Sequence, residues 1–420
     1  MPSTSTWRRS GATASSWTFP EPVRITLIGP GQPFRGGIAQ HADLLVKALG
    51  LAHEVTHLGF RRQYPRWLFG GRSDRDPSAP TREGRAERIL DPFNPLSWWR
   101  TARHLAALEP DLVIVQWWVP FWAPSFSAIL AGYRWLARRS AAPVLFICHN
   151  VLPHEHPSLP IRMLVRHVLL SADGWMLHGG ADEAALRRVL GRRLARREVG
   201  GRKRVFRGFL PLFDLGAAVP REDARAVLNL DEDAPVALFF GFVRPYKGLD
   251  GLLAAWPRVL RALPQGRLLI VGEFWQPVAA FWERARMLGV ADSVVLVNRY
   301  VADEELGLYF GAADVVAMPY VSATGSAVAP LALRFGRPMV ATAVGGIPEA
   351  VADGLSGLLV PPEDPVALAD ALVAVLADGE LRRRLTRGAE AERERFSWVE
   401  LVTRIESAAA SLRTADQAHG

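Results

Sequence analysis

Short apolar runs alternate with stretches of helical spacing, and this pattern occurs twice along the chain. Residues 23–29 form a run rich in β-branched side chains that ends in glycine, and residues 37–49 repeat apolar positions at helical intervals. Further strands are predicted at residues 54–58, 112–115, 144–148 and 174–177. After a polar stretch at residues 214–233 the alternation restarts, with strands predicted at 236–240, 267–271, 294–297, 315–318 and 339–341. The pattern predicts an α/β protein with parallel sheets that carry helices on both faces.

The polar stretch marks the predicted junction between two Rossmann-like domains, at residues 21–215 and 216–395. Residues 1–20 lack the apolar core of a signal peptide and are predicted to form a disordered extension. Residues 61–88 have little periodicity and are predicted to form a long loop, and residues 396–420 a C-terminal helix and tail. Two facing domains of this kind place ligands in the cleft outside the carboxyl ends of their strands.

Residues 112–133 contain no charged side chain and are long enough to span a bilayer. A glutamine and two prolines interrupt them, so a buried strand, a loop and a helix explain the stretch better. Four aromatic residues would lie just past that strand: Trp117, Trp118, Phe121 and Trp122. They are expected either to pack in the core or cleft or to contact a lipid interface.

Composition narrows the classes of protein. Apolar residues make up 49% and charged residues 22% of the 420, which excludes a mostly disordered chain. The one cysteine, Cys148, excludes an intramolecular disulfide framework, and its apolar surroundings predict a reduced core residue, as fits a cytoplasmic protein. The net charge is +8, and residues 187–207 alone carry ten basic side chains and one acidic one. Such a local patch suits an anionic membrane or substrate better than nucleic acid, although a solvated arginine-rich helix explains it equally well.

The first candidate motif is a glycine-rich turn between the first predicted strand and helix. Gly29 and Gly31 are followed by Gly36 and Gly37, which would expose backbone N–H groups at a helix N-terminus, where anions bind. The turn is not a dinucleotide fingerprint, because Phe34 stands where the third glycine should fall. A plain turn is the alternative interpretation.

The second motif follows the first strand of the second half. It reads Phe-Gly-Phe-Val-Arg-Pro-Tyr-Lys-Gly over residues 240–248 and contains Gly241, Arg244 and Lys247. The two cations lie three positions apart at a strand-to-helix junction, so both are expected to point into the interdomain cleft. A diphosphate leaving group needs cations there, since negative charge grows as its bond to a sugar breaks. Two solvated surface cations are the alternative.

A third block runs through residues 318–362. Thr324, Gly325, Ser326 and Ala327 precede a predicted helix, which they can cap while presenting N–H groups to phosphate. A Gly-Arg-Pro turn and a Gly-Gly-Ile-Pro-Glu segment that ends in Glu349 follow. In this order the motifs resemble nucleotide-sugar-dependent glycosyltransferases of family 4, which have the GT-B fold, over most of the chain from about Val23.

The resemblance implies two Rossmann-like domains facing across a cleft, with a C-terminal helix crossing back to the first domain. Arg244 and Lys247 would bind the donor diphosphate, which Gly36 and Gly37 would approach from the other domain. Donor contacts are also expected from Gly241 and from residues 324–327. His149, at a predicted strand end, would lie beside the transferred sugar; otherwise it is a loop histidine bonded to the backbone.

The chain departs from the family pattern at one place. Members usually carry two glutamates eight positions apart, and the matching positions here hold Ala323 and Leu331. A sub-group with a Thr-x-Ser-Gly-like stretch resembles this chain better. Glu273 is then a candidate polar contact to the donor, and Glu349 another, although Glu349 is expected mainly to cap the helix that follows it.

The resemblance implies transfer of a sugar from a nucleoside diphosphate sugar to a hydroxyl acceptor, with retention at the anomeric carbon. No acidic metal-binding cluster stands out in the sequence, so neither a metal nor another cofactor is expected. A lipid-linked or cell-envelope acceptor, on the inner face of the plasma membrane, stays open. The absent glutamates favour one alternative, a catalytically degenerate protein that binds a glycan or partners an active subunit. A nicotinamide-dependent oxidoreductase is a weaker alternative, because the third glycine of its fingerprint is missing.

Overall fold

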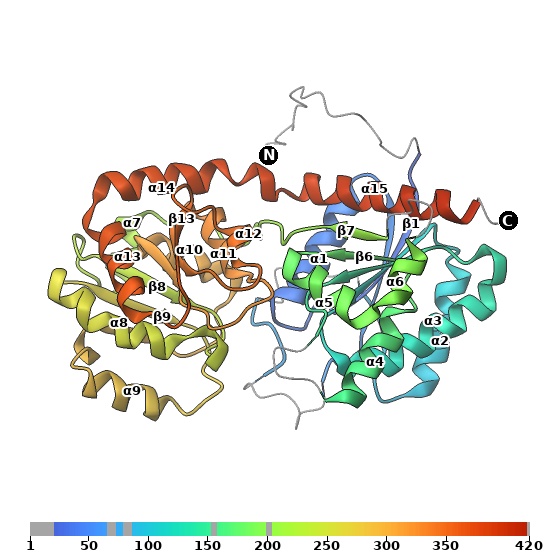
Figure 1. Ribbon diagram of the computed structural model, residues 1–420, viewed down its shortest axis with the longest axis horizontal. Helices are drawn as coiled ribbons and strands as arrows, with labels where there is room; N and C mark the ends of the chain where they lie inside the picture. Colours follow the sequence, from blue (N-terminus) through green and yellow to red (C-terminus); the bar gives the residue numbers. More distant parts are fainter. Residues whose placement is uncertain (1–20, 65–72, 79–85, 153–157, 199–203, 418–420) are drawn as a thin grey trace, which may run out of the picture.

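The computed structural model describes residues 21–64, 73–78, 86–152, 158–198 and 204–417. The predicted extension at residues 1–20 and part of the predicted loop at 61–88 lie outside them. The described chain folds into two α/β halves that stand side by side, each built on one twisted sheet (Figure 1). All strand pairs within both sheets are parallel. The expected fold class is therefore confirmed.

The first sheet has seven strands in the order β3-β2-β1-β4-β5-β6-β7. They are β1 (Arg24–Ile28), β2 (Glu54–Phe60), β3 (Glu87–Leu90), β4 (Leu112–Trp117), β5 (Val144–Cys148), β6 (Gly174–Leu177) and β7 (Val205–Arg207). Strands β4, β5 and β6 are buried along their whole length, as their continuous apolar runs require for a sheet covered on both faces.

The second sheet has six strands in the order β10-β9-β8-β11-β12-β13. They are β8 (Val236–Phe240), β9 (Arg267–Val271), β10 (Val294–Val297), β11 (Val315–Met318), β12 (Met339–Thr342) and β13 (Gly357–Val360). The proposed domain boundary at residues 215/216 falls between the last strand of the first sheet and the first strand of the second.

Helices connect most successive strands and cover both sheets. In the first half they are α1 (Gly37–Leu49), α2 (Pro95–Ala107), α3 (Ala123–Ala137), α4 (Leu159–Leu169), α5 (Gly180–Leu190) and α6 (Arg192–Arg197), with the short helices η2 (Pro120–Trp122) and η3 (Arg138–Ser140). In the second half they are α7 (Arg221–Val227), η4 (Pro245–Lys247), α8 (Leu249–Ala262), α9 (Val278–Met287), η5 (Ala291–Ser293), η6 (Asp303–Glu305), α10 (Leu306–Ala312), α11 (Val328–Arg334), α12 (Ile347–Ala350), α13 (Pro365–Ala377), α14 (Gly379–Ala391), η7 (Glu394–Phe396) and α15 (Trp398–Gln417).

The strand orders fix where a ligand can bind. In each sheet the later strands are added first on one side of the first strand and then on the other. As a result β1 lies between β2 and β4, and β8 lies between β9 and β11. Loops that leave such a switch point run to opposite faces of the sheet and open a crevice at the carboxyl ends of the strands. The glycine-rich turn after β1 and the Arg-Pro-Tyr-Lys-Gly segment after β8 are these two loops.

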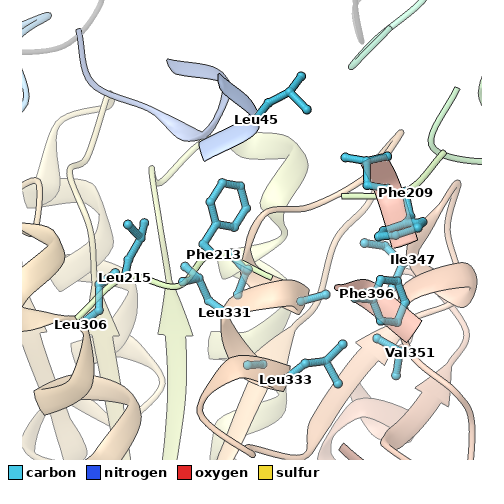
Figure 2. Close-up of a cluster of buried hydrophobic side chains, with 14 of the residues drawn as sticks. Leu45, Phe209, Phe213, Leu215, Leu306, Leu331, Leu333, Ile347, Val351 and Phe396 are labelled. Atoms are coloured by element: carbon cyan, nitrogen blue, oxygen red, sulfur yellow. The ribbon is translucent and has the colours of Figure 1, made fainter. Parts of the chain in front are cut away.

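The C-terminal helix crosses back to the first half, as expected (Figure 1). Helix α15 packs against α1 and β7, and the Oε1 atom of its Glu406 lies within hydrogen-bond distance, 3.0 Å, of His53 Nε2. One hydrophobic cluster is continuous between the halves: Phe209, Phe213 and Leu215 from the connecting segment lie among Leu306, Leu331, Ile347 and Phe396 (Figure 2). The halves are therefore joined by a buried apolar layer as well as by chain connections.

The uncharged stretch at residues 112–133 forms β4, η2 and most of α3, as predicted. Trp117, Trp118 and Trp122 are buried in the core and Phe121 is half-buried, so lipid contact by these indoles is contradicted and core packing is confirmed. No helix among the described residues has the length and apolar character to cross a membrane. Cys148 is buried and unpaired, as expected.

Several elements of the first half are absent from the sequence-based prediction, among them β3, β7 and α2. Strand β3 is a four-residue edge strand with two exposed residues, and β7 has three residues inside the arginine-rich stretch. Neither is long enough to show a period. Helix α2 carried a usable signal, because Asn94 caps it by accepting a hydrogen bond from the Leu96 N–H and Pro95 occupies its first position.

Candidate functional site

A cavity of about 230 Å³ lies between the two halves, at the switch points of both sheets. Gly36, Gly37 and Gln40 line it from the first half. The predicted site residues that line it from the second half are Gly241, Lys247, Glu273, Gly325, Ser326 and Ala327. The structure thus brings together two motifs separated by about half the chain.

Glycine is required at two places on the cavity wall. Gly36 precedes α1 with a φ of 109°, and Gly241 follows β8 with a φ of 103°. Any side chain at Gly241 would begin 2.7 Å from the Lys247 Nζ atom. These positions leave backbone bare on two sides of the cavity, which is how proteins let a phosphate approach closely.

Lys247 supplies the positive charge inside the cavity. Its side chain is buried, and its Nζ lies 5.3 Å from the ring centre of Tyr320. Its one hydrogen bond to a described residue is a long one of 3.4 Å to the Phe240 carbonyl. Burial, reinforced by the positive charge of Arg244, lowers the pKa of Lys247. An ammonium with so few partners is the group that a bound anion would satisfy.

Arg244 is placed differently from the expectation. Its guanidinium stacks on Trp275 at 4.9 Å and on Tyr246 at 5.4 Å, and it does not line the cavity. It is half-buried at the rim, close enough to influence the Lys247 ammonium. Only one of the two predicted cations therefore points into the cavity.

Glu273 already has a charged partner. Its carboxylate accepts hydrogen bonds of 2.6 and 3.1 Å from both terminal nitrogens of Arg35, and both side chains are buried. The Arg35 guanidinium also lies over the rings of Phe242 and Tyr300. Because Arg35 belongs to the turn after β1, this pair bridges the two halves at the cavity wall.

Further polar contacts continue that bridge. The Tyr300 hydroxyl accepts from the Gly36 N–H at 3.3 Å, and Gln40 donates to Asp303 at 2.7 Å. The Asp303 N–H donates to the Ser78 hydroxyl at 2.9 Å. These contacts between the halves could not be predicted from the sequence, because nothing in the separate segments indicates which residues of the two halves face each other.

The turn that precedes α11 separates the cavity from a second one of about 160 Å³. Gly325 and Ser326 line both cavities, whereas Thr324 lines only the second and hydrogen-bonds to Asn150. The Ser326 hydroxyl accepts from the Val328 N–H at 3.1 Å, which is the predicted local cap. Leu331 lines the first cavity and Ala323 is buried, so neither position offers a polar side chain to a ligand.

His149 is half-buried in a cluster of three histidines and lines neither cavity, whereas its neighbour His178 lines the second one. Its Nδ1 lies 3.2 Å from His178 Nε2, and its ring meets His41 edge-on at 4.8 Å. Burial lowers the pKa of His149 well below its usual value, with help from the two neighbouring histidines, and the pKa values of His41 and His178 fall to about 3 and about 4. The three imidazoles are therefore neutral at pH 7.

Two carboxylates from opposite halves, Asp182 on α5 and Glu349 on α12, are close enough to interact electrostatically. Burial raises the pKa of Asp182 to about 7, opposed by the Val151 backbone and reinforced by the charge of Glu349. Glu349 accepts a 2.6 Å hydrogen bond from the Gly180 N–H, at the start of α5 in the first half. The expectation that Glu349 caps the helix that follows it is thus wrong: its carboxylate caps a helix of the opposite half, which sequence could not indicate.

Within the parts of the chain that the structure describes, the His, Cys, Asp and Glu side chains form no group of three able to hold a metal ion.

Comparison with known proteins agrees with this geometry. Residues 234–378 match the family described as "Glycosyl transferases group 1". The D-inositol 3-phosphate glycosyltransferase of Segniliparus rotundus is 40% identical over 193 residues, which cover 45% of this chain and 43% of the relative. That of Kribbella flavida is 31% identical over 300 residues, which cover 66% of each chain. The chain thus spans less than half the length of the first of these relatives.

Solved structures extend the likeness to nearly the whole chain. Sucrose-phosphate synthase from Thermosynechococcus elongatus superposes with a TM-score of 0.67 at 23% identity, covering 94% of this chain and all of that one. Anabaena HepE in complex with UDP gives a TM-score of 0.69 at 19% identity, covering 93% of this chain and all of that one. The fold is GT-B. The residues that match the group 1 glycosyl transferases, 234–378, lie in its second half.

Proposed function

We propose that this protein is a glycosyltransferase that moves a sugar from a nucleoside diphosphate sugar to a hydroxyl acceptor. The observation that carries the proposal is the buried, poorly partnered ammonium of Lys247, which faces a cavity bounded by bare glycine backbone from both halves. A diphosphate supplies the charge and the oxygen atoms that such a site lacks. The match to group 1 glycosyl transferases covers this half of the site.

The donor diphosphate would lie against Lys247, with Gly241 and residues 325–327 on one side and Gly36 and Gly37 on the other. Arg244 would add positive charge from the rim. As the bond from the anomeric carbon to the diphosphate oxygen breaks, negative charge collects on the leaving group, where a fixed cation stabilises it most. A water-poor cleft strengthens this attraction and limits hydrolysis of the donor.

We further propose retention at the anomeric carbon, which follows the resemblance to family 4 and its sub-group without paired glutamates. The acceptor oxygen would bond to the anomeric carbon on the face that the diphosphate leaves, and its proton would pass to an oxygen of the departing diphosphate. Among the described residues, two carboxylates line the cavity, those of Asp303 and Glu273, and Arg35 engages the latter. This composition favours substrate-assisted transfer over double displacement through paired carboxylates.

A catalytically degenerate binding or partner protein is the second candidate. Apolar Ala323 and Leu331 at the positions of the usual glutamates favour it, as does the engagement of Glu273 by Arg35. We also propose a lipid-linked acceptor and a site of action at the inner face of the plasma membrane.

Nucleotide binding and turnover distinguish the two candidates. The purified protein is heated with UDP, GDP, ADP or dTDP, and a ligand at 100 times its dissociation constant should stabilise it by about 2.7 kcal/mol. UDP is tested first, because the Anabaena relative binds it. No stabilisation by any of the four nucleotides would contradict the glycosyltransferase and leave the degenerate protein as the candidate.

Sugar conjugates of the nucleotide that binds are then supplied as donors. D-inositol 3-phosphate is included among the acceptors because it appears in the names of the similar glycosyltransferases. Transfer to an acceptor, with the anomeric configuration of the product read by NMR, supports the enzyme and tests retention. Tight nucleotide binding without hydrolysis or transfer across the panel would favour the degenerate protein.

A further inference from the structure

Helices α2, α3 and α4 form a continuous layer over one face of the first sheet. Helix α3 contacts both α2 and α4, and the inward residues of all three join the same hydrophobic cluster (Figure 1). Helices α1 and α15 contribute to the other large cluster, on the opposite face. The outward surface of the α2–α3–α4 layer is therefore a single face of the molecule, separate from the donor cavity.

The outward positions of these helices repeat one pattern. On α2 the exposed positions include Leu96, Trp99, Arg100 and Arg103, which follow the i, i+3, i+4, i+7 spacing of one helical face. On α4 the same spacing gives Leu159, Arg162, Met163 and Arg166, all exposed. Each helix thus presents apolar and cationic side chains side by side to solvent.

Charge on this layer has one sign. The segments α2, α3, η3 and α4 contain no aspartate or glutamate. They contain seven arginines: Arg100, Arg103, Arg134, Arg138, Arg139, Arg162 and Arg166. Arg134 pairs with Asp173, and the other six are exposed without an ion pair to any described residue. A solvated surface normally interleaves both signs, so this layer is complementary to an anionic partner.

Large hydrophobic side chains are concentrated on the same face. Half of the fourteen that are exposed in the described chain lie here: Phe93, Leu96, Trp99, Trp135, Leu159, Ile161 and Met163. Trp99 on α2 and Trp135 on α3 are 43% and 65% exposed, and their ring centres lie 5.9 Å apart. This contact joins the outward faces of two helices into one apolar patch, and such patches mark interaction sites.

We propose that the α2–α3–α4 face docks on an anionic lipid bilayer. Indole rings favour the interface of a membrane, aliphatic side chains insert at its acyl boundary, and arginines bind lipid phosphates. Exposed leucine and methionine side chains fit the apolar interior of a bilayer better than they fit nucleic acid, whose polar surface they would cover. The proposal goes beyond the proposed function and does not depend on it, because it assigns surface residues that play no part in the cavity.

Vesicle co-sedimentation tests the proposal on the full chain. We expect binding to vesicles of phosphatidylcholine containing 30% phosphatidylglycerol, weak binding to phosphatidylcholine alone, and loss of binding at high salt. The triple variant Arg100→Gln, Arg103→Gln, Arg166→Gln should lower the partition coefficient about 100-fold at low ionic strength. Trp135→Ser with Met163→Ser should lower it at every salt concentration.

Matched variants on the second half control for charge and hydrophobicity. Arg383→Gln, Arg384→Gln, Arg387→Gln removes the same charge from exposed positions of α14, and Met287→Ser with Val399→Ser removes exposed apolar side chains elsewhere. These controls should bind vesicles like the unmodified protein.

Thermal midpoints and nucleotide binding, measured in parallel, exclude unfolding and keep this test separate from that of the donor site. No binding to anionic vesicles, or equal loss in the control variants, would overturn the proposal. Retention of a single-stranded oligonucleotide through the same arginines, without vesicle binding, would overturn it in favour of nucleic acid.

Discussion

Replacing Lys247 by methionine tests the central claim about the cleft. Methionine keeps most of the volume and the apolar stem of the side chain but removes the charge, so the packing against Tyr320 should persist. The ammonium is buried and has a lowered pKa, which means that the apo protein carries a desolvation cost at this position. We therefore expect Lys247→Met to leave the thermal midpoint of the free protein unchanged or higher.

The same change should weaken the response to ligand and slow transfer. Removing one preorganised cation from a developing charge costs about 2–4 kcal/mol, which corresponds to roughly a 30- to 900-fold loss in kcat/KM. Because the diphosphate is also charged in the ground state, the dissociation constant of the bound nucleoside diphosphate should rise as well. Isothermal titration of the nucleotide and a coupled assay of its release from the donor measure the two effects.

Lys47 provides the control for this experiment. It is one of only three lysines in the chain and is exposed near the end of α1, so Lys47→Met makes the same chemical change outside the cavity. Unchanged nucleotide affinity and turnover in Lys247→Met, at a level matching Lys47→Met, would refute the assignment of the diphosphate site.

Three further outcomes follow from the buried charges. Arg35→Met or Glu273→Met alone should cost about 3–5 kcal/mol and lower the thermal midpoint, whereas the double variant should recover much of the loss; additive losses would contradict a coupled pair. Asp182 has a folded pKa of about 7, above its unfolded value, so the folded protein binds one more proton than the unfolded chain between about pH 4 and 7 and becomes less stable as the pH rises through that range. Asp182→Asn should therefore raise the thermal midpoint by several degrees at pH 8 and little at pH 4. An effect that does not depend on pH would disprove this. His178 has a folded pKa of about 4, below its unfolded value, so stability should fall as pH drops from about 6.5 to 4, and His178→Gln should flatten that slope in thermal melts.

Contacts between the two halves explain why part of the candidate site could not be predicted from the sequence. Arg35 adjoins the glycines of the first motif, and Glu273 was a candidate donor contact, yet nothing local links them across 238 positions. The pairing exists because loops at the carboxyl ends of strands in both sheets, the turn after β1 and the segment after β9, meet at the same cleft. Likewise, Glu349 was expected to cap the helix that follows it, and it caps α5 of the other half.

The sequence by itself determined the parts of the fold that rest on local periodicity. Apolar runs and helical spacing identified β1, α1, β4, β5, β8, β9 and β11, and glycines at positive φ such as Gly36 and Gly241 marked turns that only glycine makes easily. Burial of the tryptophans after β4, the inward turn of Lys247 and the outward stacking of Arg244 were decided by tertiary packing. The physical reason is that local backbone preference depends on neighbours in the chain, whereas solvent exposure and charge pairing depend on which distant segments arrive at the same place.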